Sequence, residues 1–332
     1  MGTRLRWSLA FWCGAALAAG LPNPSQPSST QPSPSSSGTA PVPNVSVVAP
    51  EPRYVAPTLR DQIGRIWAPV YINGKGPFRL VLDTGASNSA VTASVAQALG
   101  IPLNEGEPIE LRGVNGSALV PSIRVKNMLV GDLLINAPLL PIVPDALGGA
   151  QGVLGTEGLL DKRIFIDFRH DQITIKRSRG RIRGFGFVTI PMRITANHLL
   201  TTTARVASMR VTAIIDTGAE SSIANLALRQ ELQRHRSRYK FAADTVLGAT
   251  DVLTSGQDAA FPPIYLGDVQ IDGAHITTGD MQIFDLWKLT DKPAILIGMD
   301  ALGTLDELVI DYRARELQLL VHRTGITETV EH

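Results

Sequence analysis

The chain of 332 residues has a single cysteine, Cys13, which lies near the N-terminus. One cysteine excludes an intramolecular disulfide, and without a Cys-x-x-Cys pair the sequence has no thiolate cluster for a metal ion or a redox centre. None of the six histidines belongs to a His-Glu-x-x-His pair, so a zinc hydrolase site of that type is excluded as well. We therefore expect neither a metal nor a cofactor.

Other common catalytic and binding signals are also missing. The sequence has no Gly-x-Ser-x-Gly elbow of a serine hydrolase, and residues 148–152 (GGAQG) lack the Lys and Ser/Thr of a phosphate-binding loop. Aromatic residues make up only 5% of the chain, and its net charge is +1. This charge supplies no field that would steer nucleic acid, so we expect no nucleic-acid partner.

The chain does contain a repeated acidic motif. Residues 81–86 (VLDTGA) return almost unchanged as residues 214–219 (IIDTGA), 133 positions later. An apolar run that ends in Asp predicts a buried strand that delivers a carboxylate to the edge of a core, and the Thr-Gly that follows turns the chain away. A single motif of this kind is often an ordinary turn, whereas two copies in matching frames predict a functional pair, Asp83 and Asp216.

The two motifs begin a longer repeat. Four landmarks follow each aspartate in the same order: a Gly, a Gly-Asp pair, an apolar-apolar-Gly triplet and an Ile-Asp-aromatic triplet. They lie 30, 48, 72 and 84 residues after Asp83 and 32, 51, 82 and 95 residues after Asp216. The chain therefore contains two copies of one module, and the second copy carries an insertion mostly between Gly267 and Gly298.

These motifs resemble those of the aspartic proteases of the retropepsin and pepsin type, in which an Asp-Thr-Gly loop and a later apolar-apolar-Gly element form each half of the site. Both halves match over roughly residues 65–322, with residues 153–155 (VLG) and 296–298 (LIG) as the second elements. The resemblance implies a mainly β fold of two homologous barrel-like lobes related by a pseudo-twofold axis. It implies catalytic roles for Asp83 and Asp216. The supporting loop residues that it implies are Thr84, Gly85, Ala86, Thr217, Gly218 and Ala219.

A glycine-containing turn between apolar strands lies at residues 111–117 (LRGVNGS), where the family has a hairpin that closes over the substrate as a flap. The alternative interpretation of this turn, without the resemblance, is a plain surface hairpin. The Tyr of the pepsin flap is missing here, and the counterpart at residues 247–250 (LGAT) is less rich in glycine, so we expect one working flap, on the first lobe. The flap residues implied by the resemblance are Gly113, Val114, Asn115 and Gly116.

Composition divides the chain into six segments. Residues 1–20 have two Arg before an apolar run and predict a signal peptide or N-terminal anchor. The Pro/Ser-rich residues 21–59 predict a disordered linker, with a pro-segment as the alternative. The remaining segments are an N-terminal lobe at 60–176, a basic linker at 177–186, a C-terminal lobe at 187–323 and a tail at 324–332. A cleaved chain would have no cysteine, so we expect an exported protein of a periplasm or cell envelope, with membrane attachment if the first segment is retained.

Local patterns predict individual elements. Strands are expected at residues 66–72 and 78–82 around a turn at 73–77, and helices at 94–99 and 224–240. Further strands are expected within 123–143 and 165–175. The basic linker has no interleaved aromatic residues for base stacking, which favours a solvated connection over a patch for nucleic acid or anionic lipid.

The function follows if folding brings Asp83 and Asp216 within hydrogen-bond distance. Two like charges in a poorly solvated cleft share one proton; the ionised carboxylate activates a water, and the protonated one donates to a peptide carbonyl. We therefore predict a monomeric aspartic endopeptidase that acts on polypeptides. Ala86 and Ala219 stand where pepsins carry a hydroxyl, which predicts an optimum in mildly acidic to near-neutral conditions. The alternatives are an inactive peptide-binding module of the same fold and a structural repeat whose lobes pair with another chain.

Overall fold

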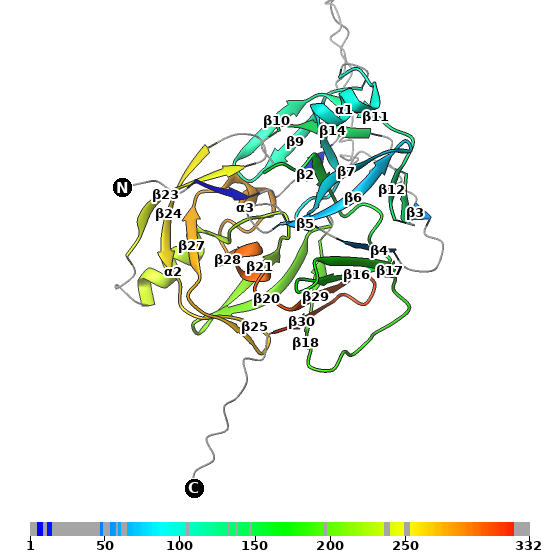
Figure 1. The fold of residues 1–332 in the computed structure, drawn as a ribbon. Coiled ribbons are helices and arrows are strands. Elements are labelled where there is room, and N and C mark those ends of the chain that lie inside the picture. The colour runs from blue at the N-terminus through cyan, green and yellow to red at the C-terminus, as the bar shows by residue number, and fades with distance from the viewer. Residues whose placement is uncertain are drawn as a thin grey trace, which may run out of the picture.

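The computed structural model describes residues 5–8, 12–14, 47–48, 54–57, 59–60 and 65–321, apart from gaps at 104–105, 132, 137–138, 146–147, 196–197, 236–239 and 249–252. Most of the predicted signal peptide or anchor, most of the Pro/Ser-rich linker and the predicted tail lie outside the described residues. The chain forms two β-rich lobes and a six-stranded sheet to which both contribute (Figure 1). The prediction of a mainly β fold is confirmed.

The first lobe is built around three buried strands. β15 (Gly152–Leu154) runs parallel to β7 (Lys75–Leu82) and antiparallel to β8 (Ala90–Thr92). The end of β7 and all of β15 and β8 are buried, because Val and Leu residues there pack on both faces of the sheet. The other elements are β3 (Val47–Val48), β5 (Leu59–Arg60), β6 (Ile66–Ile72), α1 (Ala93–Leu99), β9 (Ile109–Gly113), β10 (Gly116–Val120), β11 (Ser122–Arg124), β12 (Met128–Val130), β13 (Leu133–Ile135) and β14 (Leu139–Val143).

The second lobe repeats this centre. β28 (Ala294–Ile297) runs parallel to β21 (Met209–Ile215) and antiparallel to β22 (Ile223–Asn225), so each Asp-Thr-Gly motif leaves the same position in its lobe. This is the arrangement that the sequence repeat predicted. The other elements are β19 (Arg193–Ile194), β20 (Leu200–Val206), α2 (Leu226–His235), β23 (Ala242–Gly248), β24 (Leu253–Ala260), β25 (Ile264–Leu266), β26 (Val269–Ile271), β27 (His275–Gly279), α3 (Gln282–Leu286) and α4 (Met299–Leu302).

The six-stranded sheet joins the lobes. Its two central strands, β16 (Lys162–Asp167) and β29 (Glu307–Asp311), come from different lobes and pair antiparallel. Ile164 lies opposite Ile310 in this pair, and both side chains are fully buried in a core cluster that spans the two lobes. Because the two lobes share this core, the sheet fixes their relative position. The outer strands are β4 (Tyr54–Pro57), β17 (Gln172–Arg177), β18 (Val188–Pro191) and β30 (Glu316–Leu320).

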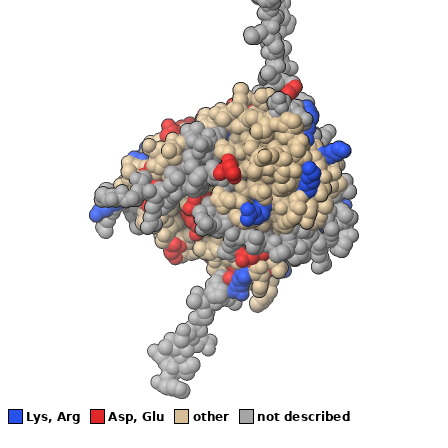
Figure 2. All heavy atoms as spheres, turned by 45° about the horizontal axis from the view of Figure 1, so that its top comes forward, with Lys and Arg blue, Asp and Glu red and all other residues tan. Residues whose placement is uncertain are grey.

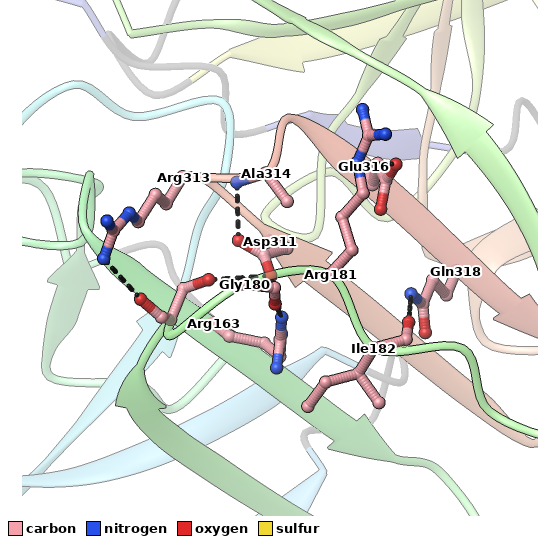
Figure 3. Close-up of polar contacts among 10 residues, drawn as sticks. Arg163, Gly180, Arg181, Ile182, Asp311, Arg313, Ala314, Glu316 and Gln318 are labelled. Atoms are coloured by element: carbon pink, nitrogen blue, oxygen red, sulfur yellow. Dashed lines mark hydrogen bonds and ion pairs between the residues drawn. The ribbon is translucent and has the colours of Figure 1, made fainter.

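The predicted basic linker, residues 177–186, runs along this sheet (Figure 3). Three of its backbone carbonyl oxygens accept hydrogen bonds from side chains: Ser178 from Arg313, Gly180 from Arg163 and Ile182 from Gln318. Beneath the linker, the buried Arg163 pairs with the buried Asp311 of the other lobe, with 2.6 Å between Nε and Oδ2. The linker side chains beyond position 178 are mostly exposed, but its backbone is tied to both lobes.

Two short strands from the N-terminal segment lie against hairpins of the two lobes. β1 (Leu5–Ser8) pairs parallel with β23, and β2 (Trp12–Gly14) pairs antiparallel with β9. These pairings concern the backbone and do not test the function of the segment. The signal peptide or anchor at residues 1–20 stays a prediction.

Several local predictions can be compared with the structure. The helix expected at residues 94–99 is α1, which ends at Gly100 in the left-handed conformation with a φ of 76°. The turn expected at 73–77 is shorter, because Asn73 and Gly74 both have positive φ and complete it by themselves. The helix expected at 224–240 begins only at Leu226, because the residues before it pair as β22, and residues 236–239 lie outside the described part.

The described surface has a mixed charge distribution (Figure 2). On the face shown in Figure 2, charged side chains of both signs are scattered over a surface that is mostly uncharged. Among the described residues, no helix is long and apolar enough to span a membrane. Within the same ranges, no three or more His, Cys, Asp or Glu side chains cluster as metal ligands would.

Candidate active site

The loops that follow β7 and β21 lie face to face. A Cβ added to Gly85 would lie 2.6 Å from Oδ2 of Asp216, and one added to Gly218 would overlap the carboxyl group of Asp83. Only glycine lets each loop approach the carboxylate of the other lobe this closely. The structure therefore brings together the two aspartates and the loops that the sequence singled out, although they are 133 residues apart.

The threonines of the two loops hold them together. The hydroxyl of Thr84 donates to the carbonyl of Ile215 at 2.7 Å and accepts from the amide of Thr217 at 3.1 Å. The hydroxyl of Thr217 donates to the carbonyl of Leu82 at 2.7 Å and accepts from the amide of Thr84 at 3.2 Å. All four contacts are buried, so they link the lobes directly beneath the carboxylates.

Each carboxylate is hydrogen-bonded on one side only. Oδ1 of Asp83 accepts from the amide of Gly85 at 2.8 Å, and Oδ1 of Asp216 accepts from the amides of Gly218 and Ala219 at 2.9 and 3.2 Å. Apart from the other carboxyl group of the pair, no hydrogen-bond partner in the described chain reaches either Oδ2 atom, and both residues are fully buried. The Oδ2 side of each carboxylate is thus left for a proton or a ligand.

The protonation of the pair follows from this geometry. Burial, then the charge of Asp216, raise the pKa of Asp83 well above its usual value. Burial also raises the pKa of Asp216, against the lowering effect of the Gly218 amide. The two side chains lie close enough to hydrogen-bond each other, which requires a proton on one of them. The pair therefore retains one proton over a wide pH range, as two like charges in a buried site must.

The apolar-apolar-Gly elements brace the two loops in parallel ways. In the first lobe, four amides donate along the seam: Asp83 to the Leu154 carbonyl, Thr156 to the Ala86 carbonyl, Gly155 to the Ser89 hydroxyl and Ser89 to the Glu157 carboxyl. In the second lobe the equivalents are Asp216 to Ile297, Met299 to Ala219, Gly298 to the Ser222 hydroxyl and Ser222 to Asp300. Each loop is therefore held to its own lobe as well as to the other loop.

The predicted flap is the hairpin β9–β10, and its tip reaches the second lobe. Val114 is fully buried within an apolar cluster of that lobe, and its carbonyl accepts from the amide of Ile283 at 3.1 Å. The side-chain amide of Asn115 donates to the carbonyl of Val246 at 2.7 Å. In this structure the tip of the predicted flap is therefore docked on the second lobe.

Part of the chain is similar to a known protein family. Residues 68–157 match the aspartyl protease family. This match contains the first Asp-Thr-Gly loop, the flap and the first apolar-apolar-Gly element, so the resemblance inferred from the repeated motifs is confirmed. The second lobe lies outside the match, and its assignment to the same module rests on the repeated strand pairing and hydrogen bonds.

The comparisons with solved structures and with curated proteins carry no information about function. Among solved structures, the chain is similar to basic 7S globulin from soybean, with 13% identity, a TM-score of 0.45, and 83% of this chain and 98% of that chain covered. At that level the likeness carries no functional information. No curated protein matches the sequence.

Sequence reasoning missed the serine and the carboxylate that hold each Asp-Thr-Gly loop. Ser89 and Ser222 both lie six residues after their aspartate, and Glu157 and Asp300 both lie two residues after the glycine of the second element. Aligning the two modules at these offsets would have revealed an acidic residue and a serine at matching positions. The contact between them would still have required the fold, because 68 residues separate Ser89 from Glu157.

Proposed function

We propose that the protein is an aspartic endopeptidase in which Asp83 and Asp216 are the catalytic residues. One observation supports this above all: two Asp-Thr-Gly loops from different lobes face each other, with both carboxyl groups buried and one oxygen of each without a donor outside the pair in the described chain. Burying two carboxyl groups side by side costs stability, and such groups with strongly shifted pKa values are concentrated at active sites.

The proposed reaction needs only the pair and a water molecule. The ionised carboxylate accepts a proton from water as the water attacks the peptide carbonyl carbon, and the protonated carboxyl donates its proton to the carbonyl oxygen. The gem-diol collapses when one carboxyl group gives its proton to the amide nitrogen and the C–N bond breaks, while a gem-diol hydroxyl gives its proton to the other carboxylate, so that the pair again holds one proton. Gly85, Gly218 and Ala219 donate to the inner oxygens and hold the carboxylates in place throughout.

The substrate that fits this proposal is a polypeptide in extended form. Access to the pair requires the flap tip to leave Ile283 and Val246, after which Gly113–Gly116 would close over the bound chain. We further propose that the protein acts as a monomer, because its two lobes complete the pair within one chain. An exported location, in a periplasm or cell envelope, remains part of this proposal.

The alternative is a peptide-binding module that keeps the fold without cutting. The docked flap favours neither alternative, because a binding module would need the same cleft. What distinguishes them is whether the buried pair activates water. The hydrogen bonds to the inner oxygens alone do not decide this.

The test is cleavage of a peptide library by the wild type, Asp83→Asn and Asp216→Asn between about pH 1.5 and pH 9, analysed by mass spectrometry. The proposal expects cleavage by the wild type only, with an optimum in mildly acidic to near-neutral conditions. Peptide binding without cleavage at any pH would establish the alternative. An optimum well below pH 3 would contradict the expected effect of Ala86 and Ala219.

A further inference from the structure

We propose that Glu157 is a positioning residue that holds the loop of Asp83 only while its own carboxyl group is protonated, so that loss of activity at alkaline pH begins at Glu157. This inference rests on the proposed peptidase function. It concerns a side chain that does not touch the site of reaction. Its effect would pass through Ser89, at the end of the loop that begins with Asp83.

Two hydrogen bonds connect the segment of Gly155 and Glu157 with Ser89, and this connection is called the tie below. Its Oε1 accepts the amide of Ser89 at 2.6 Å, and the Ser89 hydroxyl accepts the amide of Gly155 at 3.0 Å. Its Oε2 has no hydrogen-bond donor within the described chain and lies so near Gly155 that a Cβ there would be 2.6 Å away. Glu157 is only 5% exposed, so its carboxyl group is shielded from bulk solvent.

The second lobe makes the same tie at its surface. Asp300 accepts the amide of Ser222 at 2.9 Å and its hydroxyl at 2.7 Å, as the counterpart of Glu157. Asp300 is exposed, however, and lines a surface hollow of about 660 Å³. Its charge is therefore solvated, and the tie in the second lobe is stable in the ionised form. The two lobes thus place equivalent carboxylates in opposite solvent environments.

Ionisation of Glu157 would place an uncompensated charge in the first lobe. Burial raises its pKa from 4.5 to about 7, against the lowering effects of the Ser89 hydroxyl, the Ser89 amide and its own amide. Its contacts with Ser89 and with the backbone of Gly155 involve no charged group, and it has no ion pair among the described residues. The hydrogen bonds from Ser89 to Oε1 favour the ionised form, but the charge on Oε2 has no donor, so above pH 7 the packing against Gly155 must open to let water reach it.

The consequence reaches Asp83 through a short path. Ser89 ends the loop, and Thr84 within the same loop carries the hydrogen bonds to the second lobe. A looser loop would let the carboxyl of Asp83 drift from Asp216, and catalysis falls steeply with small displacements of reacting groups. The second lobe would not respond in this pH range, because Asp300 is already solvated.

The experiment compares Glu157→Gln with wild type, and Asp300→Asn as the matched control, between pH 5 and pH 9. Gln keeps the shape and the acceptor for Ser89 but cannot ionise. With a pKa of about 7, the ratio of kcat/KM for Glu157→Gln to that of wild type should rise about tenfold between pH 6 and pH 8, mainly through kcat. The corresponding ratio for Asp300→Asn should stay level.

A second readout does not depend on activity. The difference in Tm between Glu157→Gln and wild type should increase by at least about 4 °C between pH 5 and pH 8, because only the wild type must ionise a buried group. A kcat/KM ratio and a difference in Tm that both stay constant with pH would overturn the proposal. A pH-dependent difference in Tm without any cleavage by the wild type would support the structural role of Glu157 and would refute the peptidase function instead.

Discussion

Thr84 and Thr217 complete each other's hydrogen bonds across the boundary between the lobes. Each hydroxyl donates to a carbonyl of the other lobe at 2.7 Å and accepts the backbone amide of the other threonine at 3.1 or 3.2 Å. Neither loop is satisfied without the other, since these groups are buried. The geometry of the carboxylates therefore depends on correct docking of the lobes.

The first prediction concerns the aspartates. Asp83→Asn and Asp216→Asn should each lower kcat/KM by at least about 10³-fold, because an amide can neither take the proton from water nor share one with the remaining carboxyl. Circular dichroism should show an unchanged fold. Substantial cleavage by either variant, after exclusion of contaminating protease, would contradict the assigned pair.

The second prediction separates shape from hydrogen bonding at Thr84. Thr84→Val keeps the volume but leaves the Ile215 carbonyl and the Thr217 amide unpaired in a buried site, which should cost about 2–4 kcal/mol of unfolding free energy. Thr84→Ser retains the hydroxyl and should cost less than half as much. Urea unfolding followed by fluorescence measures both, and equal losses in the two variants would show that packing rather than hydrogen bonding matters here.

The third prediction concerns stability and pH. The pKa of Asp83 is raised in the folded state, so wild type loses stability as the pH rises from about 4, where the unfolded carboxyl ionises, towards the folded value. Asp83→Asn cannot ionise and should gain in Tm relative to wild type between pH 4 and pH 8. A difference in Tm that shrinks as pH rises would mean that the carboxyl is stabilised in its ionised form.

The fourth prediction concerns the flap. Asn115→Ala removes the hydrogen bond to the Val246 carbonyl, worth about 1 kcal/mol, and should raise the open population about fivefold. Amide hydrogen exchange within residues 109–120 should become faster. Leu119→Ser changes a side chain on the same hairpin that is 73% exposed and should leave the exchange unchanged. Similar acceleration in both variants would indicate general loosening of the hairpin.

The fifth prediction concerns the buried ion pair beneath the linker, shown in Figure 3. Arg163→Met should destabilise the protein by about 3–5 kcal/mol, because it leaves Asp311 charged and buried. Adding Asp311→Asn should recover part of the loss, since an amide oxygen can still accept the amide of Ala314. Guanidinium unfolding of both single variants and the double variant measures this coupling, and strictly additive losses would contradict it.

Local features of the molecule followed from the sequence with few errors. The end of α1 at Gly100 and the position of the flap turn depend on residues close together in the chain, so their signals are contained in short stretches. The turn at Asn73 and Gly74 was misjudged because Lys75, Gly76 and Pro77 look like turn residues but already belong to β7, where Lys75 pairs with Ile72. Likewise, Ile223–Asn225 has helical neighbours and nevertheless forms β22 beside β28.

The sequence by itself determined that the protein has two copies of one β module, each with an Asp-Thr-Gly loop, because duplication leaves the same residues in the same order. Only the tertiary structure decided which atoms meet. Two contacts join segments far apart in the chain: the hydrogen bonds between Thr84 and Thr217, and the contact of Val114 with Ile283. The tertiary structure also buries Glu157 and exposes its counterpart Asp300. Such contacts are set by how whole sheets pack, and residue patterns report only on the few positions around them.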